Sequence, residues 1–192
     1  MSASSYGIIV EGGYDSAVYS TIINKLSPNA PVITRECEGR PNLMKIFPGL
    51  LRTFEHALAG RPVDMAIVIR DADGKNPSEV EATMLEKIAG RTYPFPLEVK
   101  FFAVSQAMEA WLLADTEALD KASRDRGGKR VTRTLDTPES LHNPKESLRR
   151  LLIDHKLDYT AELARRIAYG TDLKKLGQTC PRFRVFAERV DC

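Results

Sequence analysis

An uninterrupted apolar segment followed by two aspartates is the feature that most constrains the fold. Residues Met65 to Ile69 have the sequence MAIVI, and Asp71-Ala-Asp-Gly74 follows one residue later. A strand with one face in water alternates apolar and polar residues, but this segment has no alternation, so protein is expected to cover both faces. Central strands of parallel sheets have this character. The segment therefore predicts an α/β fold with a buried strand that leads into two carboxylates.

Short apolar strands alternate with helical segments through the first half of the chain. Apolar residues recur at helical spacing between the strands, and Pro48 is expected to kink or break the second helix. This order predicts right-handed βαβ crossovers and a mainly parallel sheet of about four strands with helices on both faces. The predicted strands are residues 8–10, 32–34, 65–69 and 97–104, and the predicted helices are residues 14–26, 43–58 and 79–88.

After Val104 the sequence has helical periodicity only, in residues 107–113, 145–152, 159–169 and 182–190. Residues 123–137 are polar, basic and glycine-containing, which predicts a mobile loop. We expect an α/β core over residues 1–115 and a helical extension over residues 116–192, packed together as a single compact domain. A chain of 192 residues with 43% apolar content is long enough to bury such a core.

Charge and cysteine content favour a soluble, cytoplasmic protein. The formal net charge is only +2, so no overall field attracts nucleic acid or an anionic membrane, and a polyanion must bind a local patch. The three cysteines have no CxxC spacing, which argues against a disulfide framework or a zinc site. No secretion signal and no run of about 20 apolar residues is present, so no membrane partner is expected. The oligomeric state stays open.

Three carboxylates are expected to meet at the carboxyl edge of the sheet. Glu11 ends the first predicted strand, and Asp71 and Asp73 follow the third. If these strands are neighbours, the acids converge and repel one another, and Mg²⁺ neutralises such a cluster with oxygen ligands. The alternative is that each acid only caps a helix or forms a turn. The combination of three acids favours the metal site.

Several motifs resemble known families. The segment Ile9-Val-Glu-Gly-x-x-Asp15, followed by an apolar strand and Asp71-x-Asp73, resembles the Toprim domain of topoisomerases, primases and small nucleases, which has a Rossmann-like sheet. Three later motifs resemble a Toprim-like bacterial family, domain of unknown function 4276, over nearly the whole chain. These motifs are Ala107-Met-Glu-Ala-Trp-Leu-Leu-Ala-Asp115, Asn143-Pro-Lys145 and Cys180-Pro-Arg-Phe183.

The resemblance implies a division of roles among the acids. Glu11 is expected to act as the general acid/base, and Asp71 and Asp73 are expected to hold Mg²⁺ or Mn²⁺. Glu109, the glutamate of the EAWLLAD motif, follows the fourth predicted strand by a few residues and is predicted to be an optional further metal ligand. The alternative is a solvated glutamate that complements the helix dipole. Asp15 is predicted to cap the first helix rather than to take part in catalysis. No other cofactor is implied.

Other residues have simpler expected roles or contact the substrate. Trp111, Leu112 and Leu113 are predicted to belong to the core, Asp115 to cap a turn, and Cys180 to be a buried structural residue. Arg70 is predicted to pair with a carboxylate, and the alternative is that it contacts a phosphate in a bidentate way. Substrate phosphate is expected to meet Lys145, which can also reach an acid, and the basic loop residues Lys129, Arg130 and Arg133, for which the alternative is a solvated surface.

Two functions remain for this chain. The first is a Mg²⁺-dependent nuclease or related phosphodiester-processing enzyme that acts on DNA or RNA in defence or repair. The second is a non-catalytic Toprim-like module that binds nucleic acid or a partner such as an ATPase. A P-loop nucleotidase is excluded because Gly127-Gly-Lys-Arg130 lacks the required spacing and hydroxyl residue.

Overall fold

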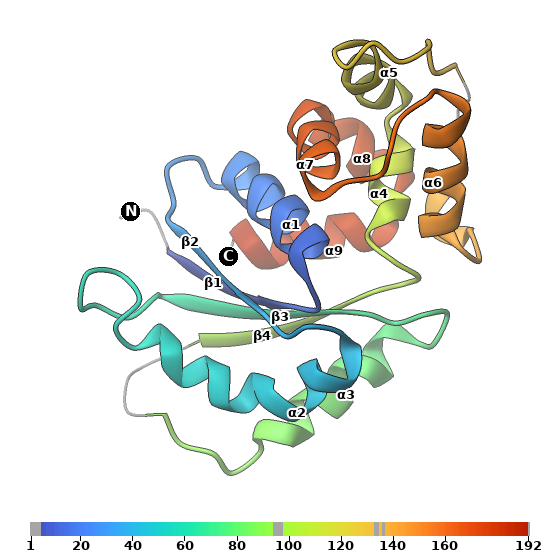
Figure 1. Cartoon of the computed structure of the whole chain (residues 1–192). Coiled ribbons are helices and arrows are strands. Elements are labelled where there is room, and N and C mark those ends of the chain that lie inside the picture. The colour runs from blue at the N-terminus through green and yellow to red at the C-terminus, as the bar shows by residue number, and fades with distance from the viewer. Residues whose placement is uncertain (1–4, 94–97, 133–134, 136, 192) are drawn as a thin grey trace.

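The computed structural model describes residues 5–93, 98–132, 135 and 137–191. Its centre is one sheet of four parallel strands in the order β2-β1-β3-β4, with helices on both faces (Figure 1). The strands are β1 (Tyr6–Val10), β2 (Val32–Glu36), β3 (Met65–Asp71) and β4 (Glu98–Val104). This confirms the predicted α/β class and the four-stranded parallel sheet.

The two acid-bearing strands, β1 and β3, are neighbours at the centre of the sheet. Their register places Ile9 opposite Val68. Glu11 lies two residues after Ile9 and Asp71 lies three residues after Val68, so both acids are close to the same end of the paired strands. The chain adds β2 on one side of β1 and then β3 and β4 on the other, so the direction of winding reverses between β1 and β3. In open α/β sheets this reversal leaves a crevice at the carboxyl ends of the strands.

Alternation along β3 divides the interior into two cores. Met65, Ile67 and Ile69 face the core that contains α1, whereas Ala66 and Val68 face the core that contains α2 and α3. All five are buried, which explains why the segment has no polar alternation. The same alternation directs the next two residues of the strand, Arg70 and Asp71, to opposite faces of the sheet.

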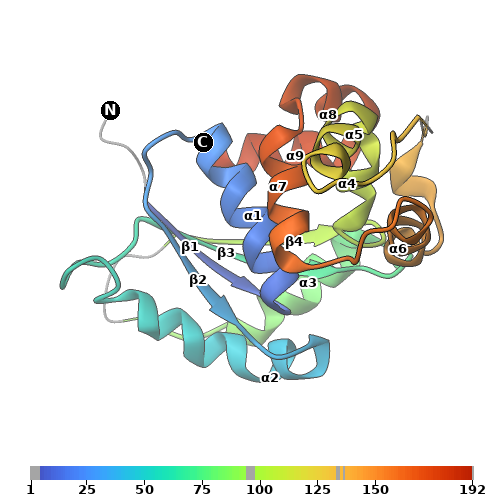
Figure 2. The ribbon, with the colours of Figure 1, turned by 45° about the horizontal axis from the view of Figure 1, so that its top comes forward.

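Helices cover the two faces unequally (Figures 1 and 2). One face carries α2 (Arg40–Leu50), the 3-10 turn η1 (Leu51–Phe54) and α3 (Pro77–Ile88). The other face carries α1 (Gly13–Leu26) and the helices of the second half, which share a single core with the sheet. They are α4 (Glu109–Ala114), α5 (Thr116–Arg124), η2 (Pro138–Ser140), α6 (Pro144–Asp154), α7 (Ala161–Gly170), α8 (Leu173–Thr179) and α9 (Pro181–Asp191).

Several predicted element boundaries are wrong. The second helix ends at Leu50 and continues as η1, and Pro48 lies inside α2 rather than at its end. Helices α5 and α8 were not predicted, because they contain only one and two large apolar residues. The start of the predicted loop, Ser123 to Arg124, belongs to α5. No helix within the described ranges is long and apolar enough to cross a membrane.

The outer edge of β4 is covered by side chains from helices on both faces. Glu81 of α3 accepts a hydrogen bond of 3.0 Å from the N–H of Ala103 and forms ion pairs with Arg182 and Arg189 of α9. Arg182 also donates to the carbonyl of Ala103 at 3.0 Å from Nε. These contacts satisfy backbone groups that an open edge strand exposes to pairing with another chain.

Candidate functional site

The carboxyl ends of β1 and β3 open into a cleft of about 310 Å³, which we call the acidic cleft. Five carboxylates from different elements line it, and Lys145 of α6 lines it as well. The cleft therefore lies where the winding of the sheet reverses, as the positions of Glu11 and Asp71 predict. The five carboxylates are those of Glu11, Asp15, Glu38, Asp71 and Glu109.

Asp71 is the acid of this cleft that burial affects most. Its side chain forms no ion pair within the part of the chain that the structure describes. Burial raises the pKa of Asp71 well above its ordinary value, and the nearby carboxylates of Asp15 and Glu11 raise it further. Its backbone N–H donates to Oε1 of Glu11 at 3.4 Å. A cation bound here would reverse this destabilisation of the ionised form.

Asp15 has the predicted capping role and also belongs to the acidic cleft. Its Oδ2 accepts a hydrogen bond of 3.1 Å from the backbone N–H of Gly12, at the start of α1. Burial, followed by repulsion from Glu109 and Glu11, raises the pKa of Asp15 to about 7. Its charge therefore changes near neutral pH, unlike that of an ordinary helix cap.

Arg40 neutralises two of the three acids that the sequence places together. Its Nε lies 3.8 Å from Oε1 of Glu11, and its Nη2 forms an ion pair with Oδ2 of Asp73. The loop before Arg40 is held against β1 because the N–H of Gly39 donates to the carbonyl of Glu11 at 2.8 Å. Burial raises the pKa of Glu11, an effect that the Arg40 guanidinium partly offsets.

Asp73 is directed away from the acidic cleft. Asp73 and Gly74 both have left-handed backbone conformations, with φ of 47° and 76°. This turn leaves the Asp73 side chain 41% exposed beside Arg40, and Asp73 is not among the residues that line the cleft. Its predicted role as a metal ligand stays a prediction, and it requires the ion pair with Arg40 to open.

Glu109 contributes the most buried carboxylate of the cleft, at 3% exposure. The hydroxyl of Tyr159 donates to its Oε1 at 3.1 Å, and Nζ of Lys145 lies 3.9 Å from the same oxygen. Lys145 sits in the first turn of α6 after Pro144, as predicted, and its Nζ lies 5.6 Å from the ring centroid of Tyr14. Lys145 thus contacts an acid directly.

The donor atoms of the acidic cleft fit a hard cation in kind, because all are carboxylate oxygens. Over the described ranges, no three Asp, Glu, His or Cys side chains are grouped closely enough to hold one ion together. Mg²⁺ is commonly held by one or two carboxylates, with water and substrate phosphate in the remaining positions. The cleft is therefore suited to a site of that incomplete kind, in which Asp71 is the available carboxylate.

The predicted phosphate-binding loop lies apart from the acidic cleft. Lys129 and Arg130 are exposed and do not line it, and Arg133 lies outside the described residues. The loop is attached instead to α5 and α6, since the carbonyl of Lys129 accepts a bond of 2.8 Å from Ser123 and its N–H donates to His155. Of the predicted phosphate ligands that are described, Lys145 is beside the acids.

The core and capping predictions are confirmed for the second half. Trp111, Leu112 and Leu113 are buried, and so is Cys180. Asp115 accepts hydrogen bonds from the N–H groups of Glu117 and Ala118 at the start of α5. Trp111, Leu112 and Leu113 therefore pack α4 into the core, Asp115 caps α5, and Cys180 is buried between α8 and α9.

Three residues of the site were not predicted: Glu38, Arg40 and Tyr159. Arg40 follows Gly39 and precedes Pro41, a pattern that marks a helix start just after the second strand. That placement puts Arg40 at the carboxyl edge of the sheet. The sequence pattern could therefore have identified Arg40 as a cation close to the acids. Tyr159 has no such signal, because its contact with Glu109 joins residues 50 positions apart.

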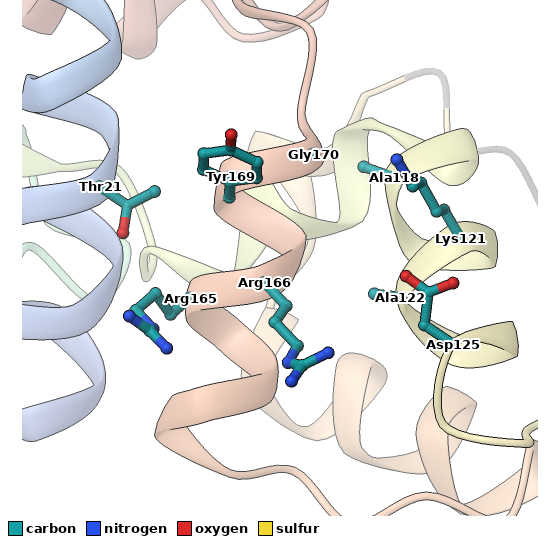
Figure 3. Close-up of a pocket in the computed structure, with 9 residues that line it drawn as sticks. All are labelled: Thr21, Ala118, Lys121, Ala122, Asp125, Arg165, Arg166, Tyr169 and Gly170. Atoms are coloured by element: carbon teal, nitrogen blue, oxygen red, sulfur yellow. The ribbon is translucent and has the colours of Figure 1, made fainter. Parts of the chain in front are cut away.

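A second hollow of about 420 Å³ lies between α1, α5 and α7 (Figure 3). It contains the cations Lys121, Arg165 and Arg166, together with Asp125 and the exposed ring of Tyr169. Arg166 is already paired with Glu162. The hollow contains none of the residues predicted for the functional site.

Comparison with protein families matches residues 10–191 to the family described as Domain of unknown function (DUF4276). The chain belongs to this family. The match begins at Val10, directly before Glu11, and extends through α9, so the DUF4276 domain includes both the acidic edge of the sheet and the helices that complete the cleft. No curated protein and no solved structure matches the chain in the corresponding comparisons.

Proposed function

We propose that this DUF4276 protein is a divalent-metal-dependent phosphodiester-processing enzyme, most simply a nuclease that acts on DNA or RNA. The observation that carries the proposal is the position of Asp71, a half-buried carboxylate at the switch point of the sheet that has other acids beside it. A carboxylate in this setting is stabilised by a bound cation. The proposed cofactor is Mg²⁺ or Mn²⁺.

The roles of the residues follow from their positions. Asp71 would hold the ion, with Asp73 or Glu109 as further ligands once Arg40 or Lys145 moves aside. The ion would supply Lewis-acid stabilisation of phosphoryl oxygen and a water of lowered pKa. Glu11 would act as the general acid/base, since burial already raises its pKa toward the range useful for proton transfer. Lys145 would contact the substrate phosphate.

The relationship to Toprim domains is part of this proposal. It rests on the glutamate at the end of β1 and on the Asp71-x-Asp73 motif after β3, both at the carboxyl edge of a parallel sheet. In Toprim enzymes the corresponding acids bind Mg²⁺ and act on phosphodiesters. A role in defence or repair would follow from such an activity.

The alternative is a non-catalytic module that binds nucleic acid or a partner ATPase. One observation favours it: Arg40 pairs with Asp73 and lies beside Glu11, and Lys145 lies beside Glu109, so protein cations replace the metal for three of the acids. In that case the acids would hold the helices on the sheet and would have no catalytic role.

Metal-dependent stabilisation and cleavage test the proposal. Mn²⁺ or Mg²⁺ should raise the melting temperature of the wild-type protein, and the double variant Asp71→Asn with Asp73→Asn should lose the increase. The exposed residue Asp154 provides a matched control, so Asp154→Asn should keep the increase. Absence of any metal-dependent increase in the wild type would contradict the metal site.

Cleavage is measured on labelled single-stranded DNA, duplex DNA and RNA. Glu11→Gln should abolish metal-dependent cleavage while the melting temperature without metal stays near that of the wild type. Glu86→Gln, on the exposed side of α3, is the control that should retain activity. Binding of nucleic acid without cleavage under every metal condition would favour the non-catalytic module.

A further inference from the structure

Arg70 has an unusual position directly beside Asp71 in the sequence and on the opposite face of the sheet. Asp71 lines the acidic cleft, whereas Arg70 lies on the side of α2 and α3. The Nε of Arg70 is buried and has no hydrogen-bond partner. In the ranges that the structure describes, Arg70 forms no ion pair, so its predicted pairing with a carboxylate is wrong. A partly buried guanidinium without an anion is unfavourable.

The Arg70 side chain opens into a separate cleft of about 270 Å³, which we call the basic cleft. Three cations line it, those of Arg40, Arg70 and Lys75, together with a single acid among the lining residues, Glu79. Ala72 and Val80 form its apolar floor, and Thr83 contributes a hydroxyl. Within the described part of the chain, Lys75 also has no ion-pair partner. Because Arg40 is already paired with Asp73, the excess positive charge of this cleft comes from Arg70 and Lys75 against Glu79, and it suits an anion.

The basic cleft adjoins the acidic cleft at Arg40. Arg40 lines the basic cleft, and its Nε lies 3.8 Å from Oε1 of Glu11, which lines the acidic cleft. The alternation of side chains along β3 produces this arrangement, because successive residues of one strand supply a cation to one cleft and an acid to the other. The two clefts therefore meet at the contact between Arg40 and Glu11.

We propose that the basic cleft binds a backbone phosphate of a nucleic-acid strand, next to the phosphodiester that the acidic cleft would process. The inference rests on the proposed function for the identity of the substrate. Arg70 supplies the bidentate guanidinium donors that phosphate prefers, and Lys75 supplies a mobile point charge. A phosphate in the basic cleft would compete with Asp73 for Arg40, which lines the cleft.

The other basic surfaces are less suited to this role. In the hollow between α1, α5 and α7, Arg166 is paired with Glu162, and Asp125 also lines the hollow (Figure 3). That hollow reaches α1 at Thr21, six residues after Asp15, which corresponds to about 9 Å along the helix. In the loop after α5, Arg126 is paired with Glu162. Neither surface adjoins the acids.

The proposal is tested without catalysis by measuring how the protein binds 5′-labelled single-stranded oligonucleotides in EDTA. Fluorescence anisotropy gives the affinity at several salt concentrations. Arg70→Ala and Lys75→Ala should each weaken binding by about tenfold and lower the slope of log affinity against log salt by about one. Arg70→Lys should restore part of the loss. Arg149→Ala, an exposed arginine on α6, is the matched control and should bind as the wild type does.

Several outcomes would overturn the subsite. Equal affinity of the wild type, Arg70→Ala and Lys75→Ala at every salt concentration is one, and failure of the wild type to bind any oligonucleotide is another. The increase in melting temperature that inorganic phosphate causes is measured for the same variants. If this increase depends on Arg70 and Lys75 but oligonucleotide binding does not, the cleft binds free phosphate and the backbone assignment is wrong. Lys75 is exposed, so Lys75→Ala keeps the test valid if Arg70→Ala does not fold.

The result is separable from the proposed function. Arg70-dependent binding in EDTA without any metal-dependent cleavage would leave the phosphate subsite in place and remove the enzyme. Metal-dependent cleavage by the wild type, together with unchanged oligonucleotide binding by Arg70→Ala and Lys75→Ala, would support the enzyme and remove the phosphate subsite.

Discussion

The hydroxyl of Tyr159 donates a hydrogen bond of 3.1 Å to Oε1 of Glu109. Tyr159 precedes α7 and Glu109 begins α4, so this bond joins two parts of the helical second half at the acidic cleft. The Tyr159 carbonyl in turn accepts a bond of 3.0 Å from the hydroxyl of Tyr14 on α1. The second half of the chain therefore completes the site instead of only covering the sheet.

Tyr159→Phe should destabilise the protein by about 1–3 kcal/mol, because the buried Glu109 carboxylate loses a donor. For a domain of this size that corresponds to a decrease of roughly 2–10 °C in melting temperature. Thermal unfolding followed by circular dichroism measures the change. Tyr169→Phe is the control, since Tyr169 is 76% exposed and its change should stay within about 0.5 kcal/mol. Equal effects of the two variants would contradict the role of the bond.

Asp15 should make the metal-free protein less stable as pH rises. Its pKa is about 7 in the folded state and 3.8 as the reference value, so the native state binds more protons between these pH values. The free energy of unfolding should therefore decrease by up to about 1.4 kcal/mol per pH unit from this group as pH rises toward 7, and then level off.

Asp15→Asn should remove this dependence. Urea unfolding in EDTA at pH 5, 6, 7 and 8 should show the variant gaining stability relative to the wild type as pH rises, whereas Asp154→Asn should show no such trend. Parallel stability curves for wild type and Asp15→Asn would mean that Asp15 is ionised normally in the folded protein.

Glu81→Gln should destabilise the covered edge of β4 by about 1–3 kcal/mol, because Arg182 and Arg189 lose their anion. Burial opposes ionisation of Glu81, but hydrogen bonds from Arg189 and the Ala103 N–H outweigh it and lower its pKa. Its contribution is therefore full above the ordinary pKa of 4.5 and is lost as pH falls through the lowered native value. Urea unfolding should show a larger difference from the wild type at pH 7 than at pH 3, and Glu86→Gln should show no difference at either pH.

Gly7→Ala should destabilise the protein by about 1–3 kcal/mol through overpacking. A Cβ at this position of β1 would lie 2.7 Å from the ring of Phe54, which is fully buried. Gly49→Ala in α2 meets nothing within 4 Å and should instead stabilise by about 0.5–1 kcal/mol. Chemical denaturation of both variants checks the pair, and a neutral effect of Gly7→Ala would show that Phe54 moves aside.

The fold class and the position of the acids were predictable because they depend on local pattern. The unbroken run before Arg70 required a strand covered on both faces, and the parallel order placed Glu11 and Asp71 at one edge. The sequence did not predict α5 or α8, because these helices contain only one and two large apolar residues, Leu119 in α5 and Leu173 and Leu176 in α8.

The sequence by itself therefore determined the parallel sheet, the central position of β3 and the acidic carboxyl edge, since these follow from side-chain periodicity and strand order. Only the tertiary structure decided which charges meet. Arg40 lies beside Glu11 and Asp73, Tyr159 bonds to Glu109, and Arg70 has no ion pair among the described residues. Ion pairs depend on distances of a few ångströms between elements far apart in the chain, and the packing of α2, α4 and α7 on the sheet sets those distances.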